Sequence, residues 1–160
     1  MVKTDEVQLR AATEKDIPVL IDIARKAFLS AFWELSPIEV IHDWVADDFE
    51  GRCYPERWPR MIVAMMDDKP VGLIEPVDDH ISGLWIHPHY HRKGIGTKLL
   101  RAGEEVVQQH GHSKVWLMVS CFNAGAPAFY KELGYREVGV ETEVLSTGVK
   151  EQLTRLEREL

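Results

Sequence analysis

Apolar positions in the first third of the chain follow a helical spacing after an initial strand at 7–11. They recur at the three-to-four-residue interval of an amphipathic helix, and Thr13, with Asp16 three residues later, is suited to cap it. A second helix is expected from the Ser36-Pro37 step to about residue 49. The positions that define the first helix are Ile17, Leu20, Ile21, Ala24 and Phe28.

Three short apolar runs follow, at 61–66, 71–77 and 80–86. Turn sequences rich in Asp and Pro separate them at 67–70 and 78–79, and this pattern predicts an antiparallel meander. The preceding segment, 51–59, contains Pro55 and Pro59 and is predicted to be a loop.

The second half of the chain returns to alternating helices and strands. A helix is predicted over 95–110, ended by Gly111. A strand over 114–120, a short helix over 124–133 and a strand over 135–144 follow. In the tail at 150–160, Leu153, Leu156 and Leu160 fit a helix, but a strand closing a hairpin with 135–144 fits as well, and we favour the strand.

The order of these elements predicts a mixed α/β sheet with helices on its faces. The runs 80–86 and 114–120 flank one helix in a βαβ unit, so they should be parallel neighbours. The segment between the first run and the helix contains two glycines and lies at the carboxyl end of a parallel strand, where open α/β sheets bind ligands.

Composition narrows the class of protein. At 160 residues, 45% of them hydrophobic and 28% charged, the chain fits one globular domain over 1–160. The net charge of −7 argues against nucleic-acid binding; it suits a cationic substrate, or serves solubility alone. Cys53 and Cys121 suggest free thiols, and neither a signal sequence nor an apolar run long enough for a membrane is seen. We expect a cytoplasmic protein, monomeric or homodimeric, that binds no membrane.

The glycine-containing segment has the character of an anion site. Gly94 and Gly96 let the backbone approach a ligand, and the first turn of the following helix offers free N–H groups at the positive end of its dipole. The neighbouring cations Arg92, Lys93 and Lys98 favour a phosphate or pyrophosphate. The segment fits neither the P-loop pattern nor the dinucleotide-binding fingerprint, and by itself it is equally a tight turn with a solvated basic face.

A second motif follows the strand at 114–120. It runs from Asn123, which can cap a helix, through Pro127 to the sequence Phe129-Tyr130 and ends at Gly134-Tyr135. Together, 91–96 and 123–135 resemble the acetyl-CoA motifs of the GNAT superfamily of N-acetyltransferases, which move an acetyl group from acetyl-CoA to an amine. The resemblance covers about 80–140. One departure is His91, which stands where the family usually has Gln or Arg.

The resemblance implies a fold and a set of site residues. The fold is a mostly antiparallel sheet of about six or seven strands, splayed at the parallel pair 80–86 and 114–120, with about four helices. Tyr130 would be the general acid that protonates the leaving thiolate, and Asn123 would bond the pantetheine amides. The residues expected to line the acetyl-CoA site are Leu84, Trp85, Ile86, His91, Arg92, Lys93, Gly94, Ile95, Gly96, Thr97, Asn123 and Tyr130.

The base and the acceptor are less defined. His80 and Glu75 are candidate bases, and a water chain to solvent is an alternative. Acceptor specificity is expected in 28–60, where Phe32, Trp33 and Glu34 are the first candidates; its aromatic and acidic residues could hold a cationic amine or be ordinary core and surface.

Met118 stands five residues before Asn123, where enzymes that acetylate protein N-termini typically carry Glu. A small-molecule amine is therefore favoured over a protein or peptide amine. A non-catalytic acyl-CoA sensor is the alternative of another class, and no metal site is expected.

Overall fold

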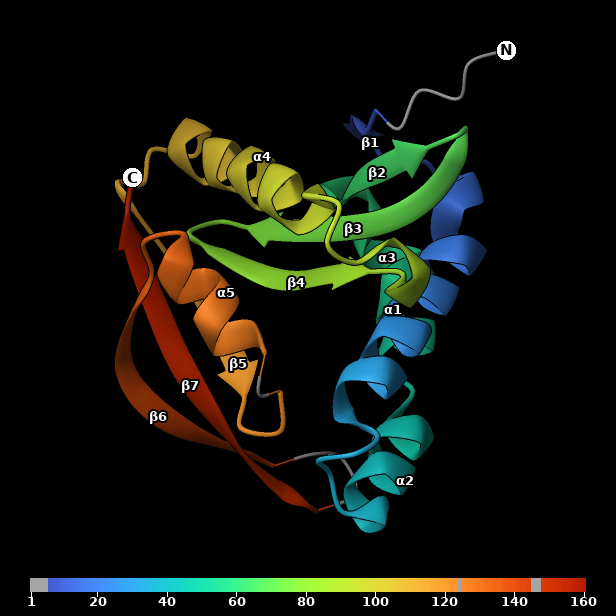
Figure 1. Cartoon of the computed structure of the whole chain (residues 1–160), viewed down its shortest axis with the longest axis vertical. Helices are drawn as coiled ribbons and strands as arrows, with labels where there is room; N and C mark the ends of the chain where they lie inside the picture. The colour runs from blue at the N-terminus through green and yellow to red at the C-terminus, as the bar shows by residue number, and fades with distance from the viewer. Residues whose placement is uncertain (1–5, 124, 145–147) are drawn as a thin grey trace.

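The strands form one mixed sheet in the computed structural model, which describes residues 6–123, 125–144 and 148–160. Within these residues the sheet has seven strands in the order β1-β2-β3-β4-β5-β7-β6 (Figure 1). Neighbours are antiparallel except β4 and β5, which are parallel. The strands are β1 (Gln8–Ala11), β2 (Ile62–Met66), β3 (Lys69–Val77), β4 (His80–Ile86), β5 (Lys114–Ser120), β6 (Arg136–Val144) and β7 (Lys150–Glu159).

Helices cover both faces of the sheet, and each face has its own apolar core. Leu99, Leu100 and Val107 of α4 pack with Tyr130 of α5 on one face. The other core is formed under α1 and α3. The helices are α1 (Ile17–Phe32), α2 (Ile38–Asp47), α3 (Phe49–Arg57), α4 (Ile95–Gln109) and α5 (Ala126–Glu132), with short 3₁₀ turns at η1 (Glu14–Asp16), η2 (Trp58–Arg60) and η3 (Pro88–Tyr90). No helix among the described residues is long and apolar enough to cross a membrane.

Most predicted elements are confirmed. The meander is β2, β3 and β4, and the helix before Gly111 is α4, with Gly111 at a positive φ of 93°. The tail is a strand, as favoured, and it pairs with β6 as a hairpin. Its residues 153–159 also pair with β5, so β7 lies between β5 and β6. The start of the predicted helix at 124 lies outside the described residues, and α5 begins at Ala126.

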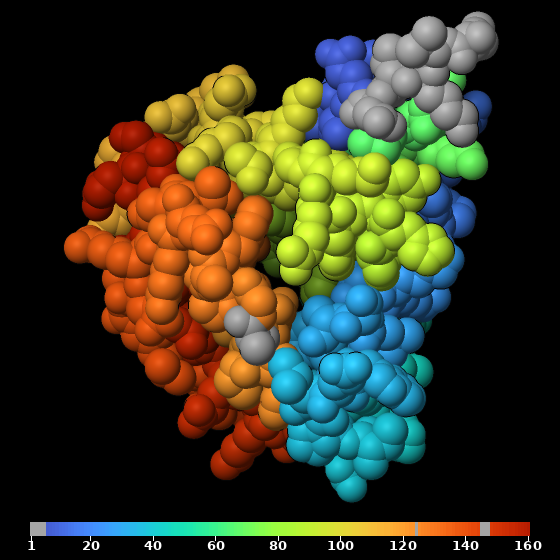
Figure 2. All heavy atoms as spheres, viewed as in Figure 1, coloured from blue at the N-terminus to red at the C-terminus, as the bar shows by residue number. Residues whose placement is uncertain are grey.

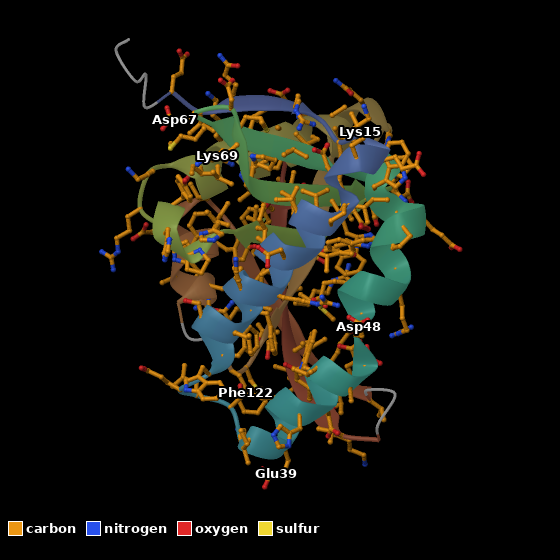
Figure 3. All side chains as sticks on the ribbon, turned by 90° about the vertical axis from the view of Figure 1, so that its right-hand side faces the viewer. Lys15, Glu39, Asp48, Asp67, Lys69 and Phe122 are labelled. Atoms are coloured by element: carbon orange, nitrogen blue, oxygen red, sulfur yellow. The ribbon has the colours of Figure 1, made fainter. Side chains whose placement is uncertain are left out.

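The predicted loop at 51–59 is wrong, because its first part is the helix α3. Asp48, at a positive φ of 47°, ends α2 and separates it from α3 (Figure 3). A Cβ at Gly51 would lie 2.3 Å from the Asp48 carboxylate, so glycine is required inside this helix by the packed side chain at its start. Pro55 is tolerated one turn later because buried Glu50 and Tyr54 fix the helix from one side.

The parallel pair is splayed. Only His80 and Trp116 form a ladder pair between β4 and β5. Beyond that pair the two strands diverge, and the edge of β4 that faces β5 has no strand partner in the described chain. An opening bordered by unpaired backbone groups therefore lies at the centre of the sheet.

Candidate functional site

Two neighbouring cavities occupy the opening between β4 and β5. The first, here the loop-side cavity, has a volume of about 710 Å³. Figure 2 shows the surface hollowed where the segment after β4, α5 and α1 meet. The residues that line it are Ala27, Ala31, Leu84, Trp85, Ile86, Tyr90, His91, Arg92, Gly94, Ile95, Gly96, Thr97, Asn123, Gly125, Ala126, Ala128, Phe129, Tyr130 and Glu132.

The backbone around Gly94 presents the start of α4 to this cavity. Arg92 and Gly94 both have positive φ, at 61° and 74°. A Cβ at Gly94 would touch nothing within 4 Å, so glycine there serves the backbone conformation and leaves the cavity wall open. No side chain caps the N-terminus of α4. The free N–H groups of its first turn therefore face the cavity as anion donors.

The cations near this loop differ in their positions. Arg92 lines the loop-side cavity, whereas Lys93 is exposed and does not line it. Lys98 donates a hydrogen bond to the backbone oxygen of Val7 and so ties α4 to the start of β1. The expectation that all three serve the anion is therefore wrong for Lys98. His91 lines the cavity with its Nε2 3.2 Å from the carbonyl oxygen of Ile86.

Asn123 lies just before the N-terminus of α5 and lines both cavities. Its Oδ1 accepts a hydrogen bond from the N–H of Ala126, the first residue of α5, at 3.3 Å. The N-cap residue of α5 is Gly125, so Asn123 bonds the start of the helix from two positions before the cap rather than as the predicted N-cap residue. Because the oxygen is used by the helix, the amide nitrogen is the part of Asn123 left for a ligand.

The second cavity, here the helix-side cavity, has a volume of about 430 Å³ and extends from β4 and β5 toward α2 and α3. It shares Leu84, Trp85, Asn123, Ala126 and Tyr130 with the loop-side cavity. The remaining residues that line it are Phe32, Trp44, Asp47, Phe49, Glu50, Arg57, His80, Ile81, Ser82, Gly83, Trp116, Leu117, Met118, Val119, Ser120, Glu143 and Leu153.

Tyr130 stands at the junction of the two cavities. It is buried, and its ring packs edge-on against Phe129 and Tyr135 with centroids 5.1 and 5.5 Å away. Burial raises the pKa of Tyr130 above its ordinary value, so the phenol keeps its proton at neutral pH. Among the described residues its hydroxyl meets no hydrogen-bond partner. A buried, protonated donor is therefore available where the cavities meet.

His80 lines the helix-side cavity, and its surroundings fix the orientation of its ring. The imidazole stacks on the indole of Trp116 with centroids 4.4 Å apart, and the guanidinium of Arg155 lies 4.2 Å from the centre of that indole. His80 Nδ1 is 3.3 Å from Asp79 Oδ1. In the tautomer that donates Nδ1–H to Asp79, Nε2 carries the lone pair and can accept a proton.

Glu75, the other candidate base, has a different setting. It is buried in β3 and does not line either cavity. Arg57 Nε donates to Glu75 Oε1 at 2.8 Å, and the same guanidinium donates to the Ser82 hydroxyl at 2.7 Å. The ion pair between Arg57 and Glu75 joins α3 to the sheet. This indicates a structural role for the Glu75 carboxylate.

The carboxylates of Glu50, Glu143 and Glu151 line or adjoin the helix-side cavity, and none of the three lines the loop-side cavity. Glu50 of α3 is only 7% exposed, and burial raises its pKa, to which Asp48 and Asp47 add. Glu151 of β7 is 1% exposed; burial raises its pKa, and the Ser120 hydroxyl, which donates to it, opposes that rise. Glu143 lines the cavity in register with Glu151.

Of the acceptor residues proposed from the sequence, the structure brings one to the cavities. Phe32 lines the helix-side cavity and stacks on Phe28, with centroids 4.5 Å apart. Trp33 is 61% exposed and Glu34 is exposed, and neither lines a cavity described above. Glu39 lies at the outer end of α2 and points away from the site (Figure 3).

Sequence reasoning missed the contribution of β6 and β7. Glu143 and Leu153 come to the helix-side cavity because β7 is inserted beside β5, and the buried Glu151 is the register partner of Glu143. No local motif marks these residues. The described residues hold no group of three or more His, Cys, Asp or Glu side chains placed to bind a metal ion.

Comparison with known proteins places this geometry in a family. A model of the acetyltransferase (GNAT) family matches residues 19–135. An N-alpha-acetyltransferase of Sulfurisphaera tokodaii is 26% identical over 155 residues, which cover 86% of this chain and 85% of that protein. An uncharacterized N-acetyltransferase of Methanocaldococcus jannaschii is 31% identical over 86 residues, or 47% of this chain but only 38% of its own length.

The fold is also that of a solved acetyltransferase. The crystal structure of PaiA N-acetyltransferase from Thermoplasma acidophilum in complex with coenzyme A has a TM-score of 0.76 and 19% sequence identity to this chain. The match covers 97% of this chain and 99% of that one. At this identity the likeness concerns the fold.

Proposed function

Because the chain belongs to the acetyltransferase (GNAT) family, we propose that it transfers an acetyl group from acetyl-CoA to a primary amine of a small molecule, with Tyr130 as the general acid. The observation that carries this proposal is the meeting of two cavities at Tyr130. A group transfer without a covalent enzyme intermediate needs donor and acceptor in contact at one point. The shared wall provides such a point.

The loop-side cavity suits the donor. Its wall combines the uncapped start of α4, the side chain of Arg92 and the open edge of β4 at 84–86. These groups match a pyrophosphate followed by an amide-containing arm, because backbone N–H groups bind phosphate oxygens and a strand edge bonds amides. The nitrogen of Asn123 is the side-chain donor nearest the point where the arm would turn toward Tyr130. The coenzyme A bound to the Thermoplasma relative supports this assignment.

The reaction follows from the groups at the junction. Acetyl-CoA supplies a thioester carbon, which the neutral amine attacks to form the new C–N bond. The C–S bond then breaks, and the sulfur leaves with the electron pair. Tyr130 donates its proton to that sulfur, and the phenolate recovers a proton from solvent or from the protonated nitrogen of the tetrahedral intermediate, which becomes the amide nitrogen. The raised pKa of Tyr130 makes its phenolate a strong base, so recovery of the proton is favourable.

The amine reaches the active site as an ammonium and has to lose a proton before it attacks. His80 is the better of the two candidate bases because it lines the helix-side cavity and Glu75 is held by Arg57. Its Nδ1 faces Asp79, which stabilises the imidazolium that forms. We assign His80 this role, with proton transfer directly or through one water.

A protein α-amine is the second candidate acceptor. The name of the Sulfurisphaera relative favours it. Against it, Met118 lines the helix-side cavity at the position where the N-terminal acetyltransferases carry Glu. The Trp44 indole of α2 lowers the pKa of the Glu151 carboxylate in β7, against the larger rise that burial causes. The two side chains are therefore neighbours, and α2 and β7 lie close together beside the cavity. A walled cavity favours a small molecule.

The test is initial-rate measurement of CoA thiol release from acetyl-CoA with a panel of aliphatic amines and N-terminal peptides. Tyr130→Phe should lower kcat about 100-fold or more on the best acceptor and leave acetyl-CoA binding near the wild-type value, because only the proton is removed. Tyr90→Phe is the matched control: this tyrosine lines the loop-side cavity away from the junction.

Three results would count against the proposal. Wild-type kcat in Tyr130→Phe contradicts the acid role. Turnover of peptides alone supports the protein amine. Tight acetyl-CoA binding with no turnover on any amine identifies a sensor.

A further inference from the structure

Buried acidic side chains in the described part of the chain fall into two groups. Three of them are paired with arginine, as expected of charges removed from water. Glu50 and Glu151 are not. Glu50 lines the helix-side cavity, and Glu151 is the register partner of Glu143, which lines it too. The paired acids are Asp16 with Arg10, Glu75 with Arg57, and Glu104 with Arg101 and Arg158.

Glu50 is the clearest of the unpaired acids. Its side chain lines the cavity although only 7% of the residue is exposed, and no other described side chain pairs with it. The cation that acts on it, Arg25, is already paired with Asp48. A buried carboxylate without a cation costs free energy unless a ligand supplies the charge.

Glu143 adds a second carboxylate to the helix-side cavity, which it lines from β6. Its register partner Glu151 is buried beside the Trp44 indole, and the Ser120 hydroxyl donates a hydrogen bond to it. Carboxylates of α3 and β6 therefore line the same cavity.

Aromatic rings line the same cavity as these carboxylates and Tyr130. Phe32, Trp44 and Phe49 all line the helix-side cavity. Their faces can pack against an alkyl chain and attract a cation at its end. An apolar stretch that ends in carboxylates has the chemistry of a site for an alkylammonium group.

We propose that the acceptor is an aliphatic diamine, with one nitrogen at Tyr130 and the second, as an ammonium, held by Glu50 in the cavity that Glu143 also lines. This inference rests on the proposed function and adds its substrate class. A monoamine of the same length fills the apolar stretch but leaves Glu50 unpaired. The diamine is favoured over it because it neutralises a desolvated charge.

The experiment compares kcat/KM for a straight-chain α,ω-diamine and for the monoamine of the same carbon number, over a series of chain lengths. The wild-type protein should prefer the diamine by about 30-fold or more at the best length, the scale expected when a buried carboxylate gains or loses its cation. Glu50→Gln should collapse that preference to about 3-fold or less, mainly through KM of the diamine.

Two further variants complete the test. Glu143→Gln changes a residue that is exposed on its strand, so folding is not at risk, and it should lower the preference for the diamine by about 3- to 10-fold. Glu56→Gln is the matched control, because Glu56 is an exposed residue of α3 that lines neither cavity. It should keep the wild-type preference.

The outcomes separate this inference from the proposed function. Equal kcat/KM for diamine and monoamine in the wild-type protein overturns the diamine site and leaves acetyl transfer standing. Equal losses on both amines in Glu50→Gln overturn it too, because Glu50 would then act in the chemistry. Absence of turnover on every amine removes the proposed function and the inference with it.

Discussion

Tyr130 owes its place at the junction to a network that other side chains maintain. Its backbone oxygen accepts hydrogen bonds from the N–H groups of Leu133 and Tyr135 as α5 ends. Tyr135, which packs on the Tyr130 ring, donates its own hydroxyl to the buried Glu104 at 2.8 Å. The phenol of Tyr130 is thus positioned by packing alone, and its hydroxyl is left for the substrate.

Glu50 shows the cost that a binding site imposes on a fold. Its pKa is raised by burial, so folding favours the protonated carboxyl. The protein therefore loses stability as pH rises from the unfolded-state value of 4.5 through the raised folded-state value. We predict that Glu50→Gln increases the free energy of unfolding by on the order of 1 kcal/mol at neutral pH, with the gain vanishing below about pH 4.

Denaturant unfolding of Glu50→Gln and wild type, measured across that pH range without substrate, checks the prediction. Glu56→Gln on the exposed side of α3 should leave stability unchanged at every pH. A Glu50→Gln variant that is less stable than wild type at neutral pH would mean that the carboxylate has a stabilising partner in the protein.

At the scale of single residues, the sequence predicted the cavity-lining residues that belong to its two motifs. The loop at 91–97 and the pair Asn123 and Tyr130 lie together around the loop-side cavity, apart from the exposed Lys93. Trp33 and Glu34 line neither cavity, and the composition of a region does not tell which of its side chains face inward. Glu50 could have been singled out only by knowing that it is buried and lines the cavity, whereas Asp48 does not line it.

At the scale of elements, α4 lies unusually close to the sheet. A Cβ at Gly103 would come within 2.6 Å of Ile74 Cδ1 and 3.0 Å of Ile81 Cδ1. Glycine there lets the helix approach β3 and β4.

Gly103→Ala should therefore destabilise the protein although alanine favours helices. We expect a loss of about 1–3 kcal/mol in the free energy of unfolding, the usual cost of an added methyl group in a packed core. Gly139→Ala on β6, where a Cβ would touch nothing within 4 Å, is the matched control and should change stability little. Thermal or urea unfolding of both variants gives the answer, and equal stabilities would contradict the close approach.

The helix α3 shows where sequence patterns fail. Gly51 and Pro55 are breakers in an isolated peptide, and the segment contains both within one short helix. The helix forms because Tyr54 is buried in the core, Arg57 is bound to Glu75, and Asp48 packs against Gly51. The pattern of apolar and polar residues does not reveal these tertiary contacts. It also does not reveal the left-handed turn at Asp48, because most Asp residues do not adopt that conformation.

At the scale of the whole molecule, the strand order decides where the acceptor can bind. The sequence predicted the parallel pair correctly, because a βαβ unit has one favoured arrangement. It predicted the final hairpin but not that β7 would enter between β5 and β6, since both orders satisfy the same alternation of apolar residues. That insertion brings Glu143 and Glu151 to the site.

The two cavities are the central feature of this arrangement, and a structure of the complex with CoA tests it most directly. In that complex the pyrophosphate should lie at the N-terminus of α4, and the pantetheine arm should follow the open edge of β4. The sulfur of CoA should lie within hydrogen-bonding reach of the Tyr130 hydroxyl. A sulfur atom away from Tyr130, or an arm that avoids the opening between β4 and β5, would contradict this arrangement.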